Sequence, residues 1–487
     1  MWDTHFLFRS SHHPSLLHDF CIKAQVMPSP RRKDGPAQRR RDGCSECRRK
    51  KVKCDLQKPV CTRCIRFPRL CKYDINMVSQ NLATQVQPAT DHLPVLQLHQ
   101  AMNALPTEPV LCLSPLLSSK ESRFFMHIFS IETAPRLFPA ASPLFLQRLI
   151  AGSLETPHLL YAILASACSH HSRLIIDTGA NSKLACLKFT NLSISSLRSA
   201  LSDRDATLTA ETVTTAMALC TNDVCNGNMQ SWRTHLGGVM RLFAALLDSQ
   251  GQICVDDPYV QCLAKWFTTM DVIAGLSGHS DSETLSFENG MFEKVFTRLD
   301  AQVDDICGYS FKLAPLLVRL SQLVQRQHQN SPEMSDEVIF ESQVLELEIL
   351  ALVDCSVPEN QHHDELQNTH LAFVHSALLH LHRRVQLVPK DHEIVKTDLS
   401  NIIKAVKNIP PFSFANILIL WPVFSAGSET DDIEERKFIH TRMGDMQSHG
   451  LGNFTRAREL LSKFWAANTP MPWDNYFANL GLELVLF

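Results

Sequence analysis

Long apolar runs are missing from this sequence. The longest mainly apolar stretch, residues 414–424, is much shorter than the roughly 18 residues that a membrane-spanning helix needs, and it contains Pro422. The first 25 residues hold no apolar run of signal-peptide length either, because histidine and arginine interrupt each short one. We therefore expect no membrane helix and no secretion signal. Without secretion, the sixteen cysteines point to metal binding rather than to disulfide bonds.

The common motifs of enzymes are also missing. The sequence contains no Gly-x-Ser-x-Gly nucleophile turn, no phosphate-binding loop and no His-Glu-x-x-His metal helix. Two pairs of adjacent histidines, at 170–171 and 362–363, lack the i, i+4 spacing with which one helix presents two ligands to a metal. We expect these histidines to be packing or surface residues. The sequence therefore does not predict an enzyme.

The overall charge says little about a nucleic-acid partner, but the distribution of the charge does. The formal net charge of the chain is −3. Between Arg31 and Asp74 there are sixteen lysines and arginines and five acidic residues, so this segment carries +11 and the remainder carries −14. This division indicates a basic region that binds a polyanion, attached to an acidic body.

Six of the cysteines form a regular constellation inside this basic region. Their spacing divides into two like halves of Cys-x2-Cys-x6-Cys. Zinc prefers four tetrahedral ligands, so one ion would leave two thiols over, whereas two ions require two bridging thiolates. We expect two zinc ions per chain, with the first cysteine of each half, Cys44 and Cys61, as the bridges. The predicted metal ligands are Cys44, Cys47, Cys54, Cys61, Cys64 and Cys71. A segment so short and so poor in apolar residues is not expected to fold without the metals.

The two halves differ in the residues between their cysteines. Five of the six residues between Cys47 and Cys54 are basic, against two of the six between Cys64 and Cys71. We therefore expect the first half to lie against DNA and the second to support it by packing, after a turn that Pro59 fixes. The predicted DNA-binding residues are Arg48, Arg49, Lys50, Lys51 and Lys53.

Two short basic runs precede the cysteines, and a proline-rich segment follows them. The runs are expected to act as a nuclear-import signal, as an arm that contacts phosphates, or as both. They comprise Arg31, Arg32, Lys33, Arg39, Arg40 and Arg41. Residues 75–118 contain five prolines and no aromatic residue, which is typical of a linker. A helical spacing begins at Ile75, but Pro88 stops it too early for a coiled coil, so this segment gives little support to dimerisation.

From about residue 119 to residue 487 the dominant hydrophobic period is helical. Apolar residues follow Thr156-Pro157 at helical spacing, and a second stripe begins at Trp232 and a third at Leu371. The first stripe consists of Leu160, Ile163, Leu164, Ala167 and Cys168. The acidic, apolar stretch 336–350 is predicted to be an amphipathic core helix rather than an activation segment. Alternation with a period of two is scarce, so we predict an all-α domain of about a dozen helices.

Residues 44–71 resemble the binuclear cluster of fungal Zn2Cys6 transcription regulators, and every cysteine of that family's motif is matched. The resemblance implies that Lys50 and Lys51, at the end of the first short helix, read a CGG-like triplet in the major groove. It also implies phosphate contacts from Arg48 and Lys53, and a role for Pro59 in holding the loop. Lysine and arginine are the usual donors to guanine, which agrees with this assignment.

The remainder of the chain is similar to the second class of fungal-specific transcription factor domain, an all-α regulatory domain. The stretch 419–427, which contains Trp421-Pro422, carries most of the likeness, together with the acidic segment 429–435 and the helix expected at 457–465. Trp232-Arg233-x-His235-Leu236 and Trp266-x4-Asp271 look similar to further landmarks of the family. We expect Trp421 to be a buried aromatic at a helix kink rather than a ligand contact.

The expected organisation is a small Zn2Cys6 binuclear-cluster module followed by a large all-α helical domain. Its predicted parts are a disordered N-terminus (1–30), a basic arm (31–42), the Zn2Cys6 DNA-binding domain (43–74), a linker (75–118) and the regulatory domain (119–487). Residues 1–26, before Met27, show no pattern and are expected to be dispensable for DNA binding.

These features predict a zinc-dependent, sequence-specific DNA-binding regulator of RNA polymerase II genes in the nucleus. Its partners would be double-stranded DNA and either the transcription machinery or a second copy of the chain. The alternative is a zinc cluster that binds proteins rather than DNA, but such a platform does not need five cations in six residues. A zinc enzyme comes third, because six cysteines around two metals leave no open coordination position.

Overall fold

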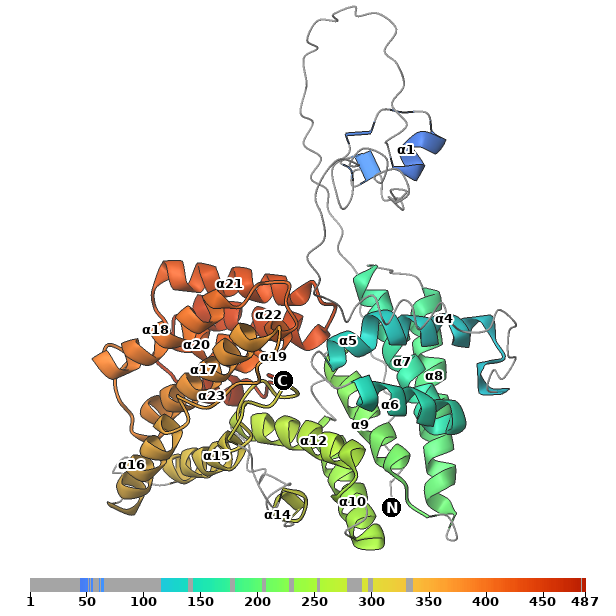
Figure 1. The fold of residues 1–487 in the computed structure, drawn as a ribbon. Helices are drawn as coiled ribbons and strands as arrows, with labels where there is room; N and C mark the ends of the chain where they lie inside the picture. Colours follow the sequence, from blue (N-terminus) through green and yellow to red (C-terminus); the bar gives the residue numbers. More distant parts are fainter. Residues whose placement is uncertain are drawn as a thin grey trace, which may run out of the picture. The chain divides into compact units, whose positions relative to one another are not determined.

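A computed structural model describes residues 44–50, 52, 54–55, 61, 63–64, 115–138, 143–175, 180–203, 207–226, 232–251, 255–277, 291–296, 301–329, 336–482 and 484–487. The chain divides into two compact units, residues 1–109 and 110–487. The first contains the short helix α1 (Ser45–Arg49), and the second contains all the other labelled elements (Figure 1).

Every labelled element of the second unit is a helix or a helical turn. Its first half contains the 3₁₀ turn η2 (Pro115–Leu117), α4 (Lys120–Ile128), the π-turn η3 (Phe129–Thr133), α5 (Ala134–Leu137), α6 (Pro143–Glu155), α7 (Pro157–Leu174), α8 (Ala180–Ser202), α9 (Ala210–Cys225), α10 (Trp232–Gln250) and α12 (Pro258–Leu276). Its second half contains α14 (Met291–Val295), α15 (Leu313–Gln329), α16 (Asp336–Leu350), α17 (His363–His380), the π-turn η4 (Leu381–Val385), α18 (Glu393–Asn408), α19 (Ala415–Leu418), α20 (Leu420–Glu429), α21 (Ile433–Gln447), α22 (Gly452–Ala467) and α23 (Trp473–Asn479).

The expected fold class is confirmed. Within the described ranges, the β-type pairing of the second unit is one isolated bridge between Val303 and Ser310. The chain therefore combines a small cysteine-rich module with a large all-α domain. None of the helices in the described ranges is long and apolar enough to span a membrane.

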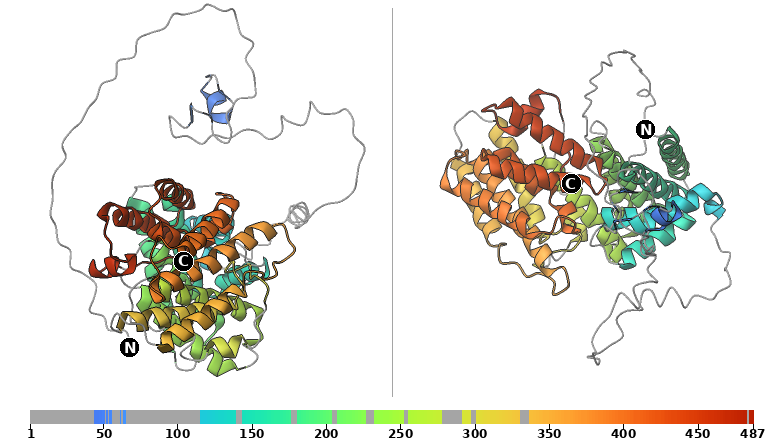
Figure 2. Two further views of the ribbon diagram at one scale, coloured as in Figure 1. Left: turned by 90° about the vertical axis from the view of Figure 1, so that its left-hand side faces the viewer. Right: turned by 90° about the horizontal axis from the view of Figure 1, so that it is seen from above.

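The helical unit has two large hydrophobic cores and a small cluster of Val303, Val357 and Leu366. The amino-terminal core comprises the buried apolar residues from Leu117 to Ala274, with Val295 and Val485. The carboxy-terminal core comprises those from Val272 to Leu486, with Cys225. The two helix groups lie side by side in Figures 1 and 2. Helix α12 joins them, because residues 259–270 and Ala274 belong mainly to the first core while Val272, Ile273 and Leu276 belong to the second.

The first two predicted helical stripes are confirmed, and the third lies in α17, where Leu371 is only half-buried. Leu160 and the other residues of the first stripe are buried in α7, and those of the stripe beginning at Trp232 are buried in α10. Helix α7 is buried on all sides rather than on one face, since nearly every residue from His158 to His170 is buried. Such a helix lies inside its domain rather than on the surface. The stretch 336–350 forms α16, which buries one face through Val338, Ser342, Leu345 and Ile349.

Trp421 is completely buried, as expected, but the proline beside it starts a helix rather than kinking one. Helix α19 ends at Leu418, and α20 begins at Leu420, so Pro422 lies in the first turn of α20. Proline is tolerated there because the first backbone N–H groups of a helix have no partner inside the helix. A Cβ atom added at Gly427 would lie 2.6 Å from a δ-methyl group of Leu461, so this side chain would have to shift to admit a larger residue where α20 approaches α22.

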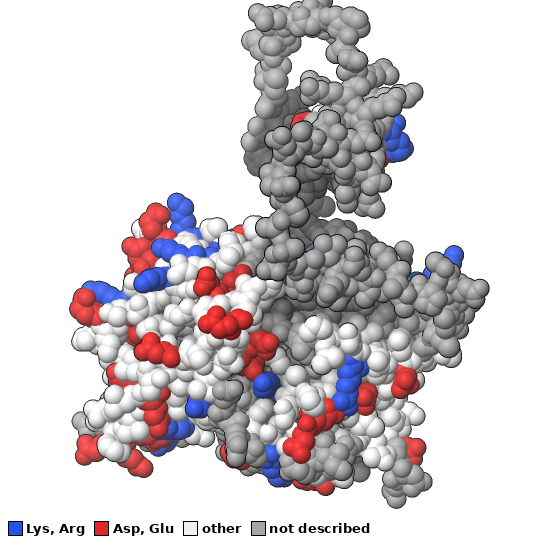
Figure 3. All heavy atoms as spheres, viewed as in Figure 1, with Lys and Arg blue, Asp and Glu red and all other residues white. Residues whose placement is uncertain are grey.

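Buried polar contacts connect distant elements of the helical unit. The guanidinium of Arg384 in η4 donates through Nε to Asp474 at 2.9 Å, and its Nη1 donates to the carbonyl of Leu276 at the end of α12. His170 in α7 contacts the hydroxyl of Thr133 at 3.0 Å and the carbonyl of His449 at 2.8 Å. At the surface, acidic and basic side chains are intermixed on the face that Figure 3 shows.

Candidate metal centre and nucleic-acid interface

The first half of the cysteine module is organised around α1. Cys44 precedes this helix, and its sulfur accepts a hydrogen bond from the backbone N–H of Cys47 at 3.4 Å. The N–H of Lys50 donates to the carbonyl of Glu46, and that of Val52 donates to the carbonyl of Cys47. A helix of five residues cannot be stable by itself, because the first turn costs more conformational entropy than its hydrogen bonds return. The contacts of its cysteines must therefore hold it.

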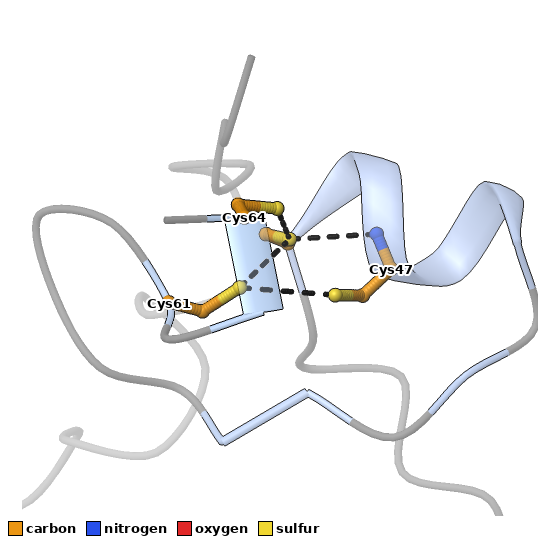
Figure 4. Close-up of side chains that lie close together, drawn as sticks. Cys47, Cys61 and Cys64 are labelled. Carbon is orange, nitrogen blue, oxygen red and sulfur yellow. Dashed lines mark hydrogen bonds between the residues drawn. The ribbon is translucent and has the colours of Figure 1, made fainter. Parts of the chain in front are cut away.

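Four cysteine sulfurs from the two halves meet in the interior of the module. The sulfur of Cys44 lies 3.9 Å from that of Cys61 and 3.8 Å from that of Cys64, and the sulfurs of Cys47 and Cys61 are 3.8 Å apart. Figure 4 shows the side chains of Cys47, on α1, and of Cys61 and Cys64 converging on the interior of the module. All four residues are buried. Each close contact joins one half of the constellation to the other.

These separations fit sulfur ligands that share zinc. Four sulfurs at about 2.3 Å from a zinc ion form a tetrahedron with edges of about 3.8 Å. Disulfide sulfurs would be separated by only about 2.05 Å. Cys44, Cys47, Cys61 and Cys64 all have sulfurs within 4.8 Å of one another, so the module has the donor set and the spacing of a thiolate metal centre.

Comparison with known families decides what this module and the helical unit are. Residues 42–77 match the family described as fungal Zn(2)-Cys(6) binuclear cluster domain. Residues 123–487, about three quarters of the chain, match the family described as fungal specific transcription factor domain. This chain is a fungal-specific transcription factor. No curated protein matches it significantly, and no solved structure does.

Membership establishes the general function of the transcription factor. It is a zinc-binding, DNA-binding protein of transcription regulation, and both matched families are transcription factor families rather than enzyme families. The cysteine module is the zinc cluster, and the helical unit is the family's transcription factor domain. Within the described ranges, the groups of residues that are spaced to hold a metal occur in the zinc cluster and not in the helical domain.

The protonation of the thiols explains why the cluster needs its metal. Burial, and the hydrogen bonds that the Cys47 thiol donates to Cys44 and Cys61, raise the pKa of Cys47 to about 12. A thiol with such a pKa stays protonated at neutral pH, whereas zinc binds the thiolate. A coordinating cation reverses this balance, because its charge deprotonates the thiol. Metal binding therefore releases the proton of Cys47 and turns this thiol into a thiolate ligand.

The other two predicted ligands are described to different extents. Cys54 is half-buried and lies with Asp55 and Cys61 in a second group whose ligand atoms are within 4.8 Å of one another. Sequence reasoning did not select Asp55, although its position next to a predicted ligand was visible. Cys71 lies outside the described residues. The set of six ligands stays a prediction.

Two of the predicted DNA-binding residues lie at the exposed end of α1. Arg49 and Lys50 are exposed, and Arg49 donates to both carboxylate oxygens of Glu46, at 3.0 and 2.8 Å. Sequence reasoning missed this ion pair, which the i, i+3 spacing of Glu46 and Arg49 could have indicated. It also omitted Arg63, an exposed cation next to Cys64 in the second half.

The remaining predicted contacts lie outside the described part of the chain. These are the side chain of Arg48, the residues Lys51 and Lys53, and the basic arm with Arg31, Arg32, Lys33, Arg39, Arg40 and Arg41. Pro59 and the linker up to residue 114 lie outside it too. Their roles stay predictions. Leu117, near the expected end of the linker, is buried in the amino-terminal core.

Proposed function

We propose that this transcription factor binds two zinc ions through six cysteines and reads a CGG-like triplet in the major groove of DNA. The observation that carries the proposal is the set of sulfur contacts of about 3.8 Å that cross between the two halves of the cluster. Cys44 contacts both sulfurs of the second half that are described, and Cys61 contacts both Cys44 and Cys47. A sulfur that bridges two zinc ions must have neighbours in both halves.

The proposed division gives each zinc four thiolates. Cys44, Cys47, Cys54 and Cys61 hold the first ion, and Cys61, Cys64, Cys71 and Cys44 hold the second. Six thiolates and two Zn²⁺ ions sum to −2, which leaves the flanking lysines and arginines to give the module a strongly positive surface. No coordination position stays open for water or a substrate, so the cluster is structural and the chain acts without catalysis.

The proposed DNA contact follows from the position of the basic residues. Lys50 is exposed just after α1, and Lys51 follows it in the sequence. We assign base contacts to Lys50 and Lys51, because lysine donates to the O6 and N7 atoms of guanine in the major groove. Arg48, Arg49 and Lys53 are assigned to phosphates, which set the affinity without carrying sequence information.

The proposal extends to the location and assembly of the protein. Arg39, Arg40 and Arg41 would direct the chain to the nucleus and steer it toward DNA. Contacts with the transcription machinery or with a second copy of the chain would fall to the helical domain, since residues 75–118 contain no extended coiled-coil pattern. Neutralising Arg39, Arg40 and Arg41 should lower nuclear accumulation of a fluorescently tagged chain, whereas deleting residues 1–26 should not. Unchanged accumulation would contradict the assignment of this run.

Metal analysis tests the cluster. The full chain should bind two equivalents of zinc, and Cys44→Ser or Cys61→Ser should lose both, because each bridge serves both ions. Cys168→Ser is the matched control, since Cys168 is buried in α7 of the helical domain and should leave both ions in place. A single equivalent in the unaltered chain would contradict the binuclear assignment.

A salt titration tests the division between base and phosphate contacts. Lys51→Ala should cost about 1–3 kcal/mol on a duplex with a CGG triplet and much less on a shuffled duplex, so that specificity collapses. Lys53→Ala should weaken both complexes nearly equally and reduce the salt slope by about one unit. A Lys51→Ala variant with undiminished preference for CGG would place base reading elsewhere. If the unaltered chain retained its zinc but bound neither duplex, the result would favour a cluster that binds proteins.

A further inference from the structure

Helix α8 carries large apolar side chains on the face that is turned away from the core. Its inner face is buried through Phe189 and through Ser193, whose hydroxyl donates to the carbonyl of His158 in α7. The outer face of such a helix is normally polar. In α8 it instead holds an apolar stripe, with Leu184 68% and Leu187 60% exposed. The outer stripe of α8 consists of Leu184, Leu187, Ile194 and Leu201.

The spacing of the outer stripe of α8 is that of a helix that packs against another helix. Its residues are separated by three, seven and seven positions, as are the a and d positions of a heptad pattern. At 1.5 Å per residue, the stripe from 184 to 201 runs for about 26 Å along the helix. Exposed apolar surface of this kind marks an interaction site on a soluble protein. The occupant that fits it is an amphipathic helix.

The charged residues of α8 are all basic. The helix contains Lys183, Lys188 and Arg198, which are exposed, and it contains no aspartate or glutamate. Lys188 pairs with Glu121 of α4 at 2.9 Å. Lys183 and Arg198 lie near the two ends of the outer stripe and have no such partner among the described residues. An occupant with acidic residues along its apolar face therefore matches α8 in charge.

Helix α16 has an outer face of that kind. It buries one face in the carboxy-terminal core, yet Phe340 and Leu347 on its outer side are each 69% exposed. Five residues of α16 are acidic and none is basic. Two of the acids pair with arginines of α15, whereas Asp336 and Glu337 are exposed in the first turn. The outer stripe of α16 consists of Phe340, Leu347 and Leu350.

The charges favour one pairing of these two stripes. Two α8 helices would bring basic residues together, and two α16 helices would bring acidic residues together, which like-charge repulsion opposes. Only α8 against α16 joins apolar to apolar and basic to acidic. The two helices lie at opposite ends of the helical unit in Figure 1, so α16 does not reach α8 of the same copy. The matching α16 must come from a second copy of the chain.

We propose that α8 binds α16 of a second copy of the transcription factor, so that copies associate head to tail. The inference rests on the part of the proposed function that assigns contacts with a second copy to the helical domain, and it names the surface. Two different helices form the contact, so each copy keeps one α8 and one α16 available for further copies. A contact between single helices is small, so the association is weak and reversible.

Sedimentation velocity of the full, zinc-loaded chain tests the association. With rising protein concentration, the average mass should increase reversibly above the 54.9 kDa of one chain. Raising the salt concentration from about 0.05 M to about 0.5 M should weaken the association, because salt screens the attraction between the basic and acidic stripes. A chain that stays monomeric up to its solubility limit would refute the proposal. Association that salt leaves unchanged would refute the pairing of charges on which it depends.

Two double variants remove one stripe each. Leu184→Ser with Leu187→Ser alters α8, and Phe340→Ser with Leu347→Ser alters α16. Each should weaken self-association at least about tenfold, because the apolar area that the contact removes from water is lost. The unfolding temperature should change little, since these side chains are mainly exposed. The control is Leu144→Ser, because Leu144 is an exposed leucine of α6 outside both stripes and its loss should leave self-association unchanged.

A mixture of the two double variants gives the most specific measurement. Neither should associate with itself, but the intact α16 of the α8 variant can bind the intact α8 of the α16 variant. The mixture should therefore form a complex of one copy of each and stop at this size, because the other contact is broken. A mixture that stays monomeric would refute the pairing of α8 with α16. So would a double variant that associates with itself as strongly as the unaltered chain does.

The outcome is separable from the proposed reading of DNA. None of these measurements uses a duplex, and none of the altered residues belongs to the zinc cluster. Failure of the association would leave the assignments of zinc ligands and base contacts intact, and loss of CGG preference would leave the contact between copies intact.

Discussion

The zinc cluster and the helical domain bury different kinds of atoms. In the described part of the first unit, the buried residues are Cys44, Cys47, Cys61 and Cys64, with only Val52 and Cys54 packed against them. The helical domain instead buries large apolar side chains, among them Trp232, Trp421 and Trp473. The cluster segment is too short and too basic to remove enough apolar surface from water, so metal–sulfur bonds take over this role.

The difference teaches how each region can respond to change. A cluster that depends on a few bonds to metal should fail completely when one bridge is lost. A domain with two hydrophobic cores distributes its stability over many contacts, so each substitution should cost only a part of it. We therefore expect the zinc cluster to be either fully folded or fully unfolded. In the helical domain, each substitution should instead lower the free energy of unfolding by a limited amount.

Removal of zinc should separate the two regions most sharply. Chelation of the full chain should unfold the cluster, because its five-residue helix has no hydrophobic core to hold it. DNA binding should disappear and residues 44–71 should become sensitive to trypsin, while the thermal unfolding of the helical domain stays unchanged. Circular dichroism and limited proteolysis would measure both. A helical domain that melts at a lower temperature after chelation would show that the two regions share their stability.

A substitution in the hydrophobic core should give the opposite pattern. Trp421 is fully buried against Phe373 and His380, so Trp421→Ala should lower the free energy of unfolding of the helical domain by about 3–5 kcal/mol. Zinc content and CGG preference should not change. Phe412→Ala is the control, because the side chain of Phe412 is 80% exposed and its loss should cost little. Urea unfolding followed by circular dichroism measures the difference.

The stability of the helical domain should also depend on pH through the protonation of His170. Burial is the main cause that lowers the pKa of His170 to about 4; the carbonyl of His449 raises this pKa, and the charges of Arg136 and Arg173 lower it. The unfolded chain therefore binds this proton more readily, so the stability from His170 is complete above about pH 6.5 and is lost as the pH falls toward 4.

The variant His170→Gln should remove this part of the acid dependence. Between pH 6.5 and pH 4 it should lose about 2 kcal/mol less stability than the unaltered chain does. His171→Gln serves as the control, since the ring of His171 packs edge-on against Phe124 rather than bonding across the domain. Equal pH slopes for His170→Gln and the unaltered chain would contradict the role of His170.

The smallest expected effect concerns the surface of the zinc cluster. Glu46→Gln removes a carboxylate that pairs with Arg49 at the face assigned to DNA. Exposed ion pairs contribute little to stability, so the cluster should keep its fold and both zinc ions. Affinity should rise by about a factor of two on CGG and shuffled duplexes alike, since a repulsive charge near phosphate is lost. A change restricted to the CGG duplex would instead indicate that Arg49 contacts a base.

The helices could be predicted from the sequence because their buried stripes recur at a spacing that few other structures produce. The stripes of α7 and α10 and the core face of α16 are examples. The position of Pro422 in a first helical turn could not be predicted, since the helix break at Ile419 depends on tertiary packing. Buried contacts between distant elements were also beyond prediction. One of them joins Arg384 to Asp474, which are separated by ninety positions and share no local pattern.

The candidate metal site was predictable for a different reason. Metal coordination imposes fixed spacings over a few residues, so the cysteine pattern itself contains the chemistry. The bridging role of Cys44 and Cys61 implies contacts between sulfurs of different halves, such as Cys44 and Cys64. Side-chain pairing on the surface was less accessible. The ion pair between Glu46 and Arg49 depends on rotamers, which the spacing allows but does not require.

The segment 484–487 has a consequence for synthesis of the protein on the ribosome. Val485 is buried in the amino-terminal core, while its neighbours Leu484 and Leu486 are buried in the carboxy-terminal core. Phe487 packs against both cores, and its ring lies 5.5 Å from that of Trp232. When α12 has been made, the amino-terminal core therefore still lacks Val485 and the contact of Phe487 with Trp232. At 5–20 residues per second it waits about 10–40 s for these last contacts, and during that interval its apolar surface is open to chaperones.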